Sequence, residues 1–165
     1  RLLHAWAVAR IGEELLARAR SHYERERQPA VLRAASSHFN RFTGGRYRGL
    51  RVPLVGAASG GFTLTAERDD ASLAAAQLSR GTAEQAYLAL RLGLLDDYLH
   101  RGNRLPILMD DVLVNFDPQR LSAALTTLVR FAAEEEAQVL FFTCHPHVVQ
   151  AARNSSPSLP VLQLS

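Results

Sequence analysis

The sequence contains no lysine and a single cysteine, Cys144, among its 165 residues. One cysteine cannot form an internal disulfide, which is consistent with a reducing compartment, and we expect a cytoplasmic protein. Without lysine the chain cannot contain the phosphate-binding loop G-x-x-x-x-G-K-[ST]. No apolar run approaches the roughly 20 residues that span a bilayer, so we expect no membrane segment and no membrane partner.

The composition is otherwise ordinary for a globular chain, with 47% hydrophobic and 21% charged residues. The length predicts one domain or most of one. Charge is uneven: residues 1–70 carry 12 arginines against 7 acids, a net charge of +5, and residues 71–165 carry 7 against 9, a net charge of −2. The chain starts at Arg1 without a secretory signal, and we expect it to be a fragment of a longer protein.

The first 27 residues have the periodicity of a helix. Val8, Ile11 and Leu15 recur at helical spacing, and arginine and glutamate fill the other faces. This helix is either the end of a coiled coil that continues upstream or an ordinary amphipathic surface helix. Pro29 ends it.

A shorter helix is predicted over residues 30–42, and two strands over 50–55 and 62–66 with a glycine-rich turn between them. Residues 71–78 are expected to be an alanine-rich connector. A basic segment, residues 41–51, carries four arginines, interleaved aromatic residues and no acid. It is either a contact for the backbone of nucleic acid or a solvated hairpin edge. The candidate DNA contacts are Arg41, Arg46, Arg48 and Arg51.

A long helix is predicted to start after Leu78 and to run to about His100. Thr82 and Gln85 have the spacing of a capping box. Ser79, Gly81 and the first free N–H groups would form an anion site at the positive end of the helix, or they are simply its cap. The helix carries two apolar stripes, which predict deep burial: Leu88, Leu92, Leu95 and Leu99, and Tyr87, Leu90, Leu94 and Tyr98.

The stretch at 105–111 predicts a strand that is buried on both faces of a parallel sheet and ends in Asp110 and Asp111. Ligands of open α/β sheets bind outside the carboxyl ends of such strands. Two adjacent acids at this place suit Mg²⁺, which takes oxygen ligands. The alternative is a helix N-terminus with two acids on its dipole.

The remaining chain again alternates a predicted helix with an apolar strand that ends in polar residues. Asp117 and Pro118 are predicted to start a helix that runs to about residue 135. Residues 138–143 form a second buried strand, followed by His145, which would face the same crevice as the acids. A short helix over 148–153 and a closing strand over 161–164 complete the prediction.

Four segments, in this order, resemble the C-terminal half of an ABC-type ATPase head. Residues 78–85 resemble the signature motif, 107–111 the Walker B strand with the catalytic acid, 114–117 the D-loop and 142–145 the switch-histidine strand. Within that class the chain resembles the YhaN-like branch of the SMC/RecF/SbcC group, coiled-coil ATPases of DNA repair and chromosome maintenance. The resemblance covers nearly the whole chain.

The resemblance implies an α/β fold, the C-terminal half of a P-loop NTPase head, with a largely parallel sheet flanked by helices. Residues 1–28 would be the end of a coiled-coil helix, and residues 29–165 the second lobe of the head. The same resemblance implies roles in hydrolysis. Asp110 would hold Mg²⁺, Asp111 would orient or deprotonate the attacking water, and His145 would contact the γ-phosphate.

A second set of residues would act on ATP held by the opposite protomer. The resemblance assigns Ser79, Gly81 and Thr82 to the γ-phosphate and Asp117 to the dimer interface. Two departures from the family pattern stand out: Arg80 replaces a glycine of the strict signature, and Asp111 replaces the more common glutamate. His147 lies close enough in sequence to compete with His145 for the switch role.

The missing phosphate-binding loop would lie on an N-terminal lobe outside the chain. We therefore expect a half-site that binds ATP poorly alone and acts in a head-to-head homodimer, with DNA and a metallophosphoesterase-type nuclease as implied partners. Two other readings stay open. One is a stand-alone Mg²⁺-dependent phosphohydrolase that uses Asp110, Asp111 and His145. The other is a non-catalytic dimerisation domain in which the first helix is the functional element.

Overall fold

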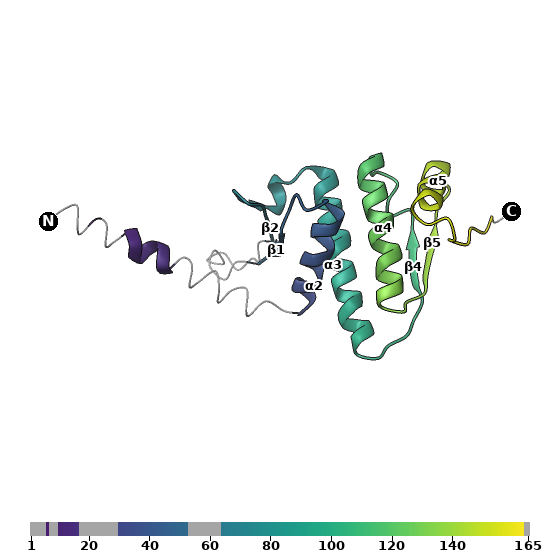
Figure 1. Ribbon diagram of the computed structural model, residues 1–165, viewed down its shortest axis with the longest axis horizontal. Helices are drawn as coiled ribbons and strands as arrows, with labels where there is room; N and C mark the ends of the chain where they lie inside the picture. The colour runs from purple at the N-terminus through teal and green to yellow at the C-terminus, as the bar shows by residue number, and fades with distance from the viewer. Residues whose placement is uncertain (1–5, 7–9, 17–29, 53–63, 164–165) are drawn as a thin grey trace.

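Figure 1 shows the computed structural model, which describes residue 6 and residues 10–16, 30–52 and 64–163. Most of the predicted first helix falls outside these residues, although residues 10–16 are helical. The predicted turn over 56–61 lies outside them entirely. Of the strands predicted over 50–55 and 62–66, only the parts that are described can be compared.

The described elements are, in chain order, α2 (Ala30–Phe42), β1 (Gly49–Arg51), β2 (Thr65–Glu67), β3 (Ser72–Ala74), the 3₁₀ turn η2 (Ala75–Gln77), α3 (Arg80–His100), β4 (Ile107–Asp110), α4 (Pro118–Glu134), β5 (Val139–Phe142) and α5 (Pro146–Ser155). β1, β2 and β3 form an antiparallel sheet, whereas β4 and β5 pair in parallel. The predicted α/β class, with helices and a parallel pair of strands, is confirmed.

The packing of α2 against α3 forms one half of the core. Gly93 of α3 lies directly over the backbone of α2 at Ala35, so the two helices approach more closely than side chains would allow. Phe39 and Leu92 are fully buried beside this contact. Gln85 reaches across from α3 and donates a 2.7 Å hydrogen bond to the carbonyl oxygen of Phe42 at the end of α2. Helix α3 is thereby fixed against α2 at its N-terminal end.

Helix α2 ends as its sequence predicts. Gly44 and Gly45 follow it with φ angles of 59° and 79°, which glycine adopts without the penalty of a side chain. The chain then turns into β1, where Ser36 of α2 accepts a 2.9 Å hydrogen bond from the backbone N–H of Leu50. The antiparallel sheet is therefore attached to the same helix.

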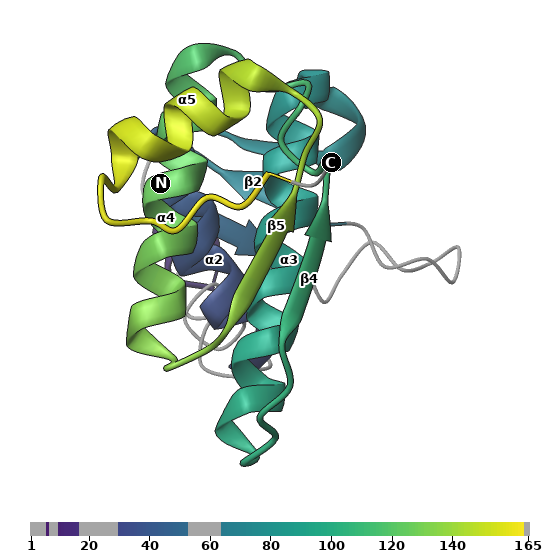
Figure 2. The ribbon, with the colours of Figure 1, turned by 90° about the vertical axis from the view of Figure 1, so that its right-hand side faces the viewer.

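The parallel pair is covered on one face only. Ile107 and Met109 of β4 point into the core and are buried, and α3 and α4 lie on that side (Figures 1 and 2). The side chains of the opposite face are exposed: Leu108 by 67%, Leu140 by 40% and Phe142 by 43%. The prediction of a strand buried on both faces is therefore wrong for this chain, because no described element covers the outer face.

Helix α3 is also less buried than its pattern predicts. The stripe that includes Leu88, Leu92 and Leu99 is buried, as expected, because it packs against the core. The second stripe is largely exposed: Tyr87 by 59% and Leu94 by 57%. One face of α3 is taken by α2 and the core, and the described residues provide nothing to cover the other.

Several boundaries differ from the sequence prediction. The expected connector over 71–78 contains β3, which pairs with β2, and the turn η2. Helix α5 starts at Pro146 and is longer than the short helix predicted over 148–153. The closing strand is not present in residues 161–163. The start of α4 is confirmed, with Asp117 as its N-cap and proline at its first turn.

Candidate functional site

Asp110 and Asp111 stand where β4 ends, at the carboxyl edge of the parallel pair. Asp110 is the last residue of the strand and is exposed, and it lies opposite Phe142 of β5. Asp111 leaves the strand with φ 48°, a left-handed conformation that aspartate tolerates better than most residues. Its backbone N–H donates a 3.0 Å hydrogen bond to the carbonyl oxygen of Phe142. The neighbouring strand end therefore holds Asp111 in place.

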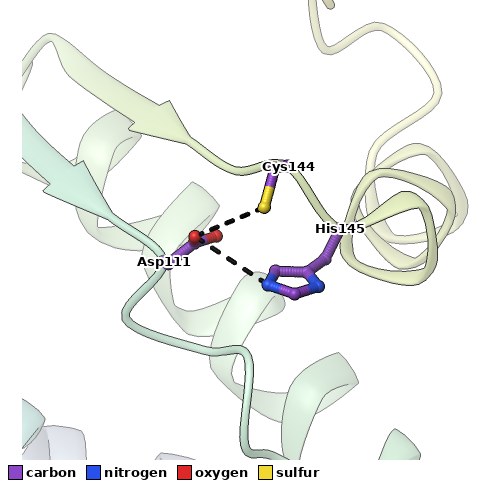
Figure 3. Close-up of side chains that lie close together, drawn as sticks. All are labelled: Asp111, Cys144 and His145. Atoms are coloured by element: carbon purple, nitrogen blue, oxygen red, sulfur yellow. Dashed lines mark hydrogen bonds and ion pairs between the residues drawn. The ribbon is translucent and has the colours of Figure 1, made fainter.

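The end of β5 brings two more side chains to Asp111, as Figure 3 shows. The Sγ atom of Cys144 lies 3.8 Å from Asp111 Oδ2, and His145 Nε2 lies 3.9 Å from the same oxygen. About a third of each of the two side chains Asp111 and His145 is exposed, so the group opens to solvent. The expectation that His145 faces the acids across adjacent strand ends holds for Asp111, but Asp110 is not in the group.

One oxygen of Asp111 needs a partner. Oδ1 is buried and, within the described residues, accepts no hydrogen bond. Buried acceptors without partners are rare in folded proteins. A water molecule that donates a hydrogen bond to this oxygen would satisfy it.

His147 lies apart from this group. Its ring centroid is 5.6 Å from that of His145, and the residue is exposed at the start of α5. There it lines a groove between α4 and α5. Of the two histidines left open by the sequence, His145 is the one within 4 Å of Asp111.

The start of α3 forms a second group of candidate residues. Ser79 is the N-cap and accepts a hydrogen bond from the backbone N–H of Thr82, whereas the sequence predicted a cap at Thr82. The two hydroxyl groups are 2.8 Å apart. Gln85 cannot complete the predicted capping box, because its side chain is bonded to the end of α2. The signature-like segment is thus a capped helix N-terminus with Thr82 buried beneath it.

Arg120 connects this helix start to the residue resembling the D-loop acid. Its guanidinium group lies over Gly81, so that a Cβ atom there would come within 3.0 Å of the Cζ atom. The Nε atom is 3.3 Å from Asp117 Oδ2, and the backbone N–H of Arg120 donates to Asp117 Oδ1 at 2.9 Å. Gly81 and Asp117 are 36 positions apart in the sequence, and the side chain of Arg120 lies against both of them.

The sequence pattern did not predict a role for Arg120. Its only local signal was an arginine three residues after a helix-capping acid, which is common and unspecific. Within the described residues, no hydrogen bond or ion pair links this group to Asp111, Cys144 and His145. The predicted site residues thus form two separate groups in one chain.

The basic segment is largely neutralised by neighbouring acids. Arg41 lies 3.2 Å from a carboxylate oxygen of Glu134. This carboxyl group has a lowered pKa, chiefly because Arg130 donates a hydrogen bond to it and secondly because Arg41 does. The other predicted DNA contacts divide into paired and exposed side chains: Arg48 pairs with Asp69, Arg51 pairs with Glu67, and Arg46 is exposed.

The donor set at the strand end fits Mg²⁺. Asp110 offers a carboxylate that is exposed at the carboxyl end of β4, the place and the ligand type that this cation prefers. Asp110 is the residue that would hold it, with water completing the coordination. When bound, the ion would neutralise the negative charge on phosphate groups.

Among the residues that the structure describes, none of the helices combines the length and the apolar character that crossing a bilayer requires.

Comparison with known proteins gives one curated relative and a set of structural neighbours. No protein-family profile matches the chain. The chain is 30% identical over 151 residues to YhaN, an uncharacterized protein of Bacillus subtilis (strain 168); the match includes 91% of this chain. It spans only 15% of the length of YhaN.

Three solved structures share the fold over 74% of the chain. A structure from work on the ATP-driven dimerization and DNA-stimulated activation of SMC ATPases has a TM-score of 0.58 at 18% identity, and 72% of it is covered. The Smc head domain of Pyrococcus furiosus with an extended coiled coil, bound to the C-terminal domain of ScpA, has a TM-score of 0.54 at 16% identity with 30% covered. An Smc head bound to the C-terminal winged-helix domain of ScpA has a TM-score of 0.57 at 17% identity with 36% covered.

Proposed function

We propose that this chain, which is related to YhaN and has the fold of SMC ATPase heads, is the second lobe of such a head in a longer ATP-hydrolysing protein. The lobe supplies the signature segment, the Walker B acids and the switch histidine. A missing N-terminal lobe supplies the phosphate-binding loop. ATP would be held between two heads, and its hydrolysis would drive work in DNA repair or chromosome maintenance.

The observation that carries the proposal is the approach of His145 to Asp111. They come from the ends of two adjacent parallel strands, and their Nε2 and Oδ2 atoms are 3.9 Å apart. In the proposed reaction the carboxylate of Asp111 holds the attacking water, and His145 donates a hydrogen bond to the transferring phosphate group. Phosphoryl transfer depends mainly on such positioning and charge stabilisation.

The group around Gly81 fits the proposed contact with nucleotide on the opposite head. The N-terminus of α3 presents free N–H groups and Ser79, and a helix start favours a negatively charged ligand. Arg120 adds a positive charge directly over Gly81. Asp117 orients Arg120 through the ion pair, which gives the D-loop residue a structural role beside the one implied by the family.

The exposed apolar faces support the presence of further lobes. Leu108 and Leu140 line the open face of the parallel pair, which an N-terminal lobe could cover. Ile11 and Leu15, four residues apart in the helical segment 10–16, are both about 60% exposed, as a coiled-coil partner would require. The domain division into residues 1–28 and 29–165 belongs to this proposal.

The proposal includes contact with DNA. Two of the SMC neighbours are bound to ScpA, and the third structure comes from work on DNA-stimulated activation, which supports a partner protein and DNA. In this chain Arg46 is the exposed candidate. The change Arg46→Ala should weaken salt-dependent DNA binding of the full-length protein, whereas Arg153→Ala, an exposed arginine on α5, should not.

The main test is ATP hydrolysis by the full-length protein. Asp111→Asn should lower the rate by about 100-fold or more, because the amide cannot accept a proton, while ATP still binds and the engaged dimer accumulates. The matched control is Asp70→Asn, an exposed carboxylate in the turn before β3, which should keep the parental rate.

A second variant tests the contact in trans. Ser79→Arg should leave ATP binding intact but abolish ATP-dependent dimerisation and hydrolysis, and Ser72→Arg, at an exposed serine of β3, is its control. Hydrolysis at the parental rate by Ser79→Arg would show that the signature assignment is wrong.

Nucleotide binding by this chain alone distinguishes the remaining alternatives. We expect a fluorescent ATP analogue with Mg²⁺ not to bind, because the chain has no lysine and hence no phosphate-binding loop. Micromolar binding, or turnover of a simple phosphate ester by the chain, would refute the half-site and favour the Mg²⁺-dependent phosphohydrolase.

A further inference from the structure

We propose that Asp111, Cys144 and His145 form a binding site for Zn²⁺ that is occupied when no nucleotide is bound. The three side chains come from the ends of two adjacent parallel strands, and their ligand atoms all lie within 4.8 Å of one another (Figure 3). Metal binding at this place does not depend on whether the protein hydrolyses ATP.

The types of donor atom select the metal. A thiolate, an imidazole nitrogen and a carboxylate oxygen are the three ligand types of protein zinc sites. Mg²⁺ is a hard cation that prefers oxygen, so the sulfur and nitrogen atoms of this group disfavour it. Asp110, the exposed neighbouring acid, remains the residue suited to Mg²⁺.

The geometry requires little movement. Zinc–ligand bonds of about 2.0–2.3 Å at tetrahedral angles place ligand atoms roughly 3.4–3.6 Å apart. The observed separations from Asp111 Oδ2 are 3.8 Å to Cys144 Sγ and 3.9 Å to His145 Nε2. Small rotations of these side chains would close the group around an ion. Three protein ligands leave the fourth position to water.

The backbone holds the ligands on fixed supports. The N–H of Asp111 is bonded to the carbonyl oxygen of Phe142 on β5, and the N–H of His145 is bonded to the hydroxyl group of Thr143. Cys144 is exposed, so the ion can enter from solvent and the thiol can lose its proton. Binding would release that proton to solvent and leave the imidazole neutral.

Occupancy by zinc would block the proposed hydrolytic site. The ion would occupy the space between Asp111 and His145 that the attacking water and the phosphate group need, and His145 could no longer donate a hydrogen bond to a phosphate group. Zinc would therefore inhibit ATP hydrolysis in the full-length protein, and Cys144→Ser would relieve this inhibition by removing the ligand that favours zinc.

The test is titration of the full-length, reduced, metal-free protein with Co²⁺ as a spectroscopic probe and with Zn²⁺ as its competitor, without nucleotide. We expect one equivalent of Co²⁺ to give a thiolate-to-cobalt charge-transfer band that Zn²⁺ removes and excess Mg²⁺ does not. Cys144→Ser should abolish the band. His145→Gln should weaken binding by about tenfold or more, and the control His147→Gln should leave it within about twofold.

Three results would overturn the site: a charge-transfer band that persists in Cys144→Ser, equal affinity in His145→Gln and the parent, or displacement of Co²⁺ by Mg²⁺. The titration contains no ATP, so its failure would leave the proposed ATPase function standing. Conversely, a protein that binds zinc at this site but never hydrolyses ATP would refute only the proposed function.

Discussion

The closest approach of α2 and α3 makes a sharp stability prediction for Gly93→Ala. A Cβ atom at Gly93 would lie 2.7 Å from the backbone nitrogen of Ala35 and 2.9 Å from its Cβ atom, and still closer to the carbonyl oxygen of Val31. These atoms belong to the backbone and first side-chain carbon of α2, so none of them can rotate away. The two helices must therefore move apart.

The size of this movement sets the expected loss. Ordinary contact begins at about 3.4 Å, so the shortest backbone nitrogen contact alone demands a shift of roughly 0.7 Å. A gap of that size forfeits a quarter to a half of the dispersion energy of the atoms that line it. Overpacking costs about 1–3 kcal/mol, and the better helix propensity of alanine returns up to about 1 kcal/mol. We expect a net loss of about 2 kcal/mol in the free energy of unfolding.

Urea unfolding of the parent and the variant measures this loss, and a melting temperature lower by about 4–8 °C should accompany it. Gly81→Ala is the matched control, because its Cβ atom would meet only the guanidinium end of Arg120, which can swing away. The control should lose less than about 0.5 kcal/mol. Equal stability of Gly93→Ala and the parent would refute the argument, as would equal losses at both glycines.

Three further changes probe other contacts. His38→Leu should lower the free energy of unfolding in urea by about 2 kcal/mol, because it leaves the largely buried carboxylate of Asp96 without its 2.7 Å hydrogen bond; adding Asp96→Leu should recover part of the loss. Asp117→Ala should cost about 1 kcal/mol by removing the N-cap of α4, whereas Asp117→Asn, which can still accept from the N–H of Arg120, should cost less in the same assay. The pKa of His100 is raised above 6.5, first by the hydrogen bond of its ring to the carbonyl oxygen of Asp96. Protonated His100 therefore stabilises the fold fully below pH 6.5. This contribution disappears as the pH rises through the pKa of His100 in the folded state. His100→Gln should therefore destabilise the chain slightly at about pH 5.5 and leave it unchanged at about pH 8.5, as measured by urea unfolding at the two pH values; equal effects at both would contradict the assignment.

Local chemistry predicted much of the chain. Asp117 and Pro118 predicted the start of α4, because aspartate is a preferred N-cap residue and proline is favoured at the first position of a helix. The two strand ends carrying Asp111 and His145 were found from apolar runs that stop at polar residues. That these ends are neighbours followed from the expectation of a parallel sheet, which the pairing of β4 with β5 confirms.

The sequence predictions that were wrong concern contacts between segments distant in the sequence. Ser79 rather than Thr82 caps α3, because Gln85, the other half of the predicted box, is drawn to the end of α2. The exposure of Leu108 could not be read from the sequence, because an apolar strand looks the same whether or not a second layer covers it. Arg120 was missed because its contact with Gly81 exists only after α3 and α4 have packed.

The left-handed backbone at Asp111 restricts which acid can occupy the end of β4. Most residues with a Cβ atom lose about 1–2 kcal/mol in this conformation, and aspartate and asparagine lose the least. Replacing Asp111 by glutamate would therefore lengthen the side chain and strain the main chain together. A library of variants at this position should return glycine, asparagine and aspartate as the best-folded members, with only aspartate retaining the carboxylate.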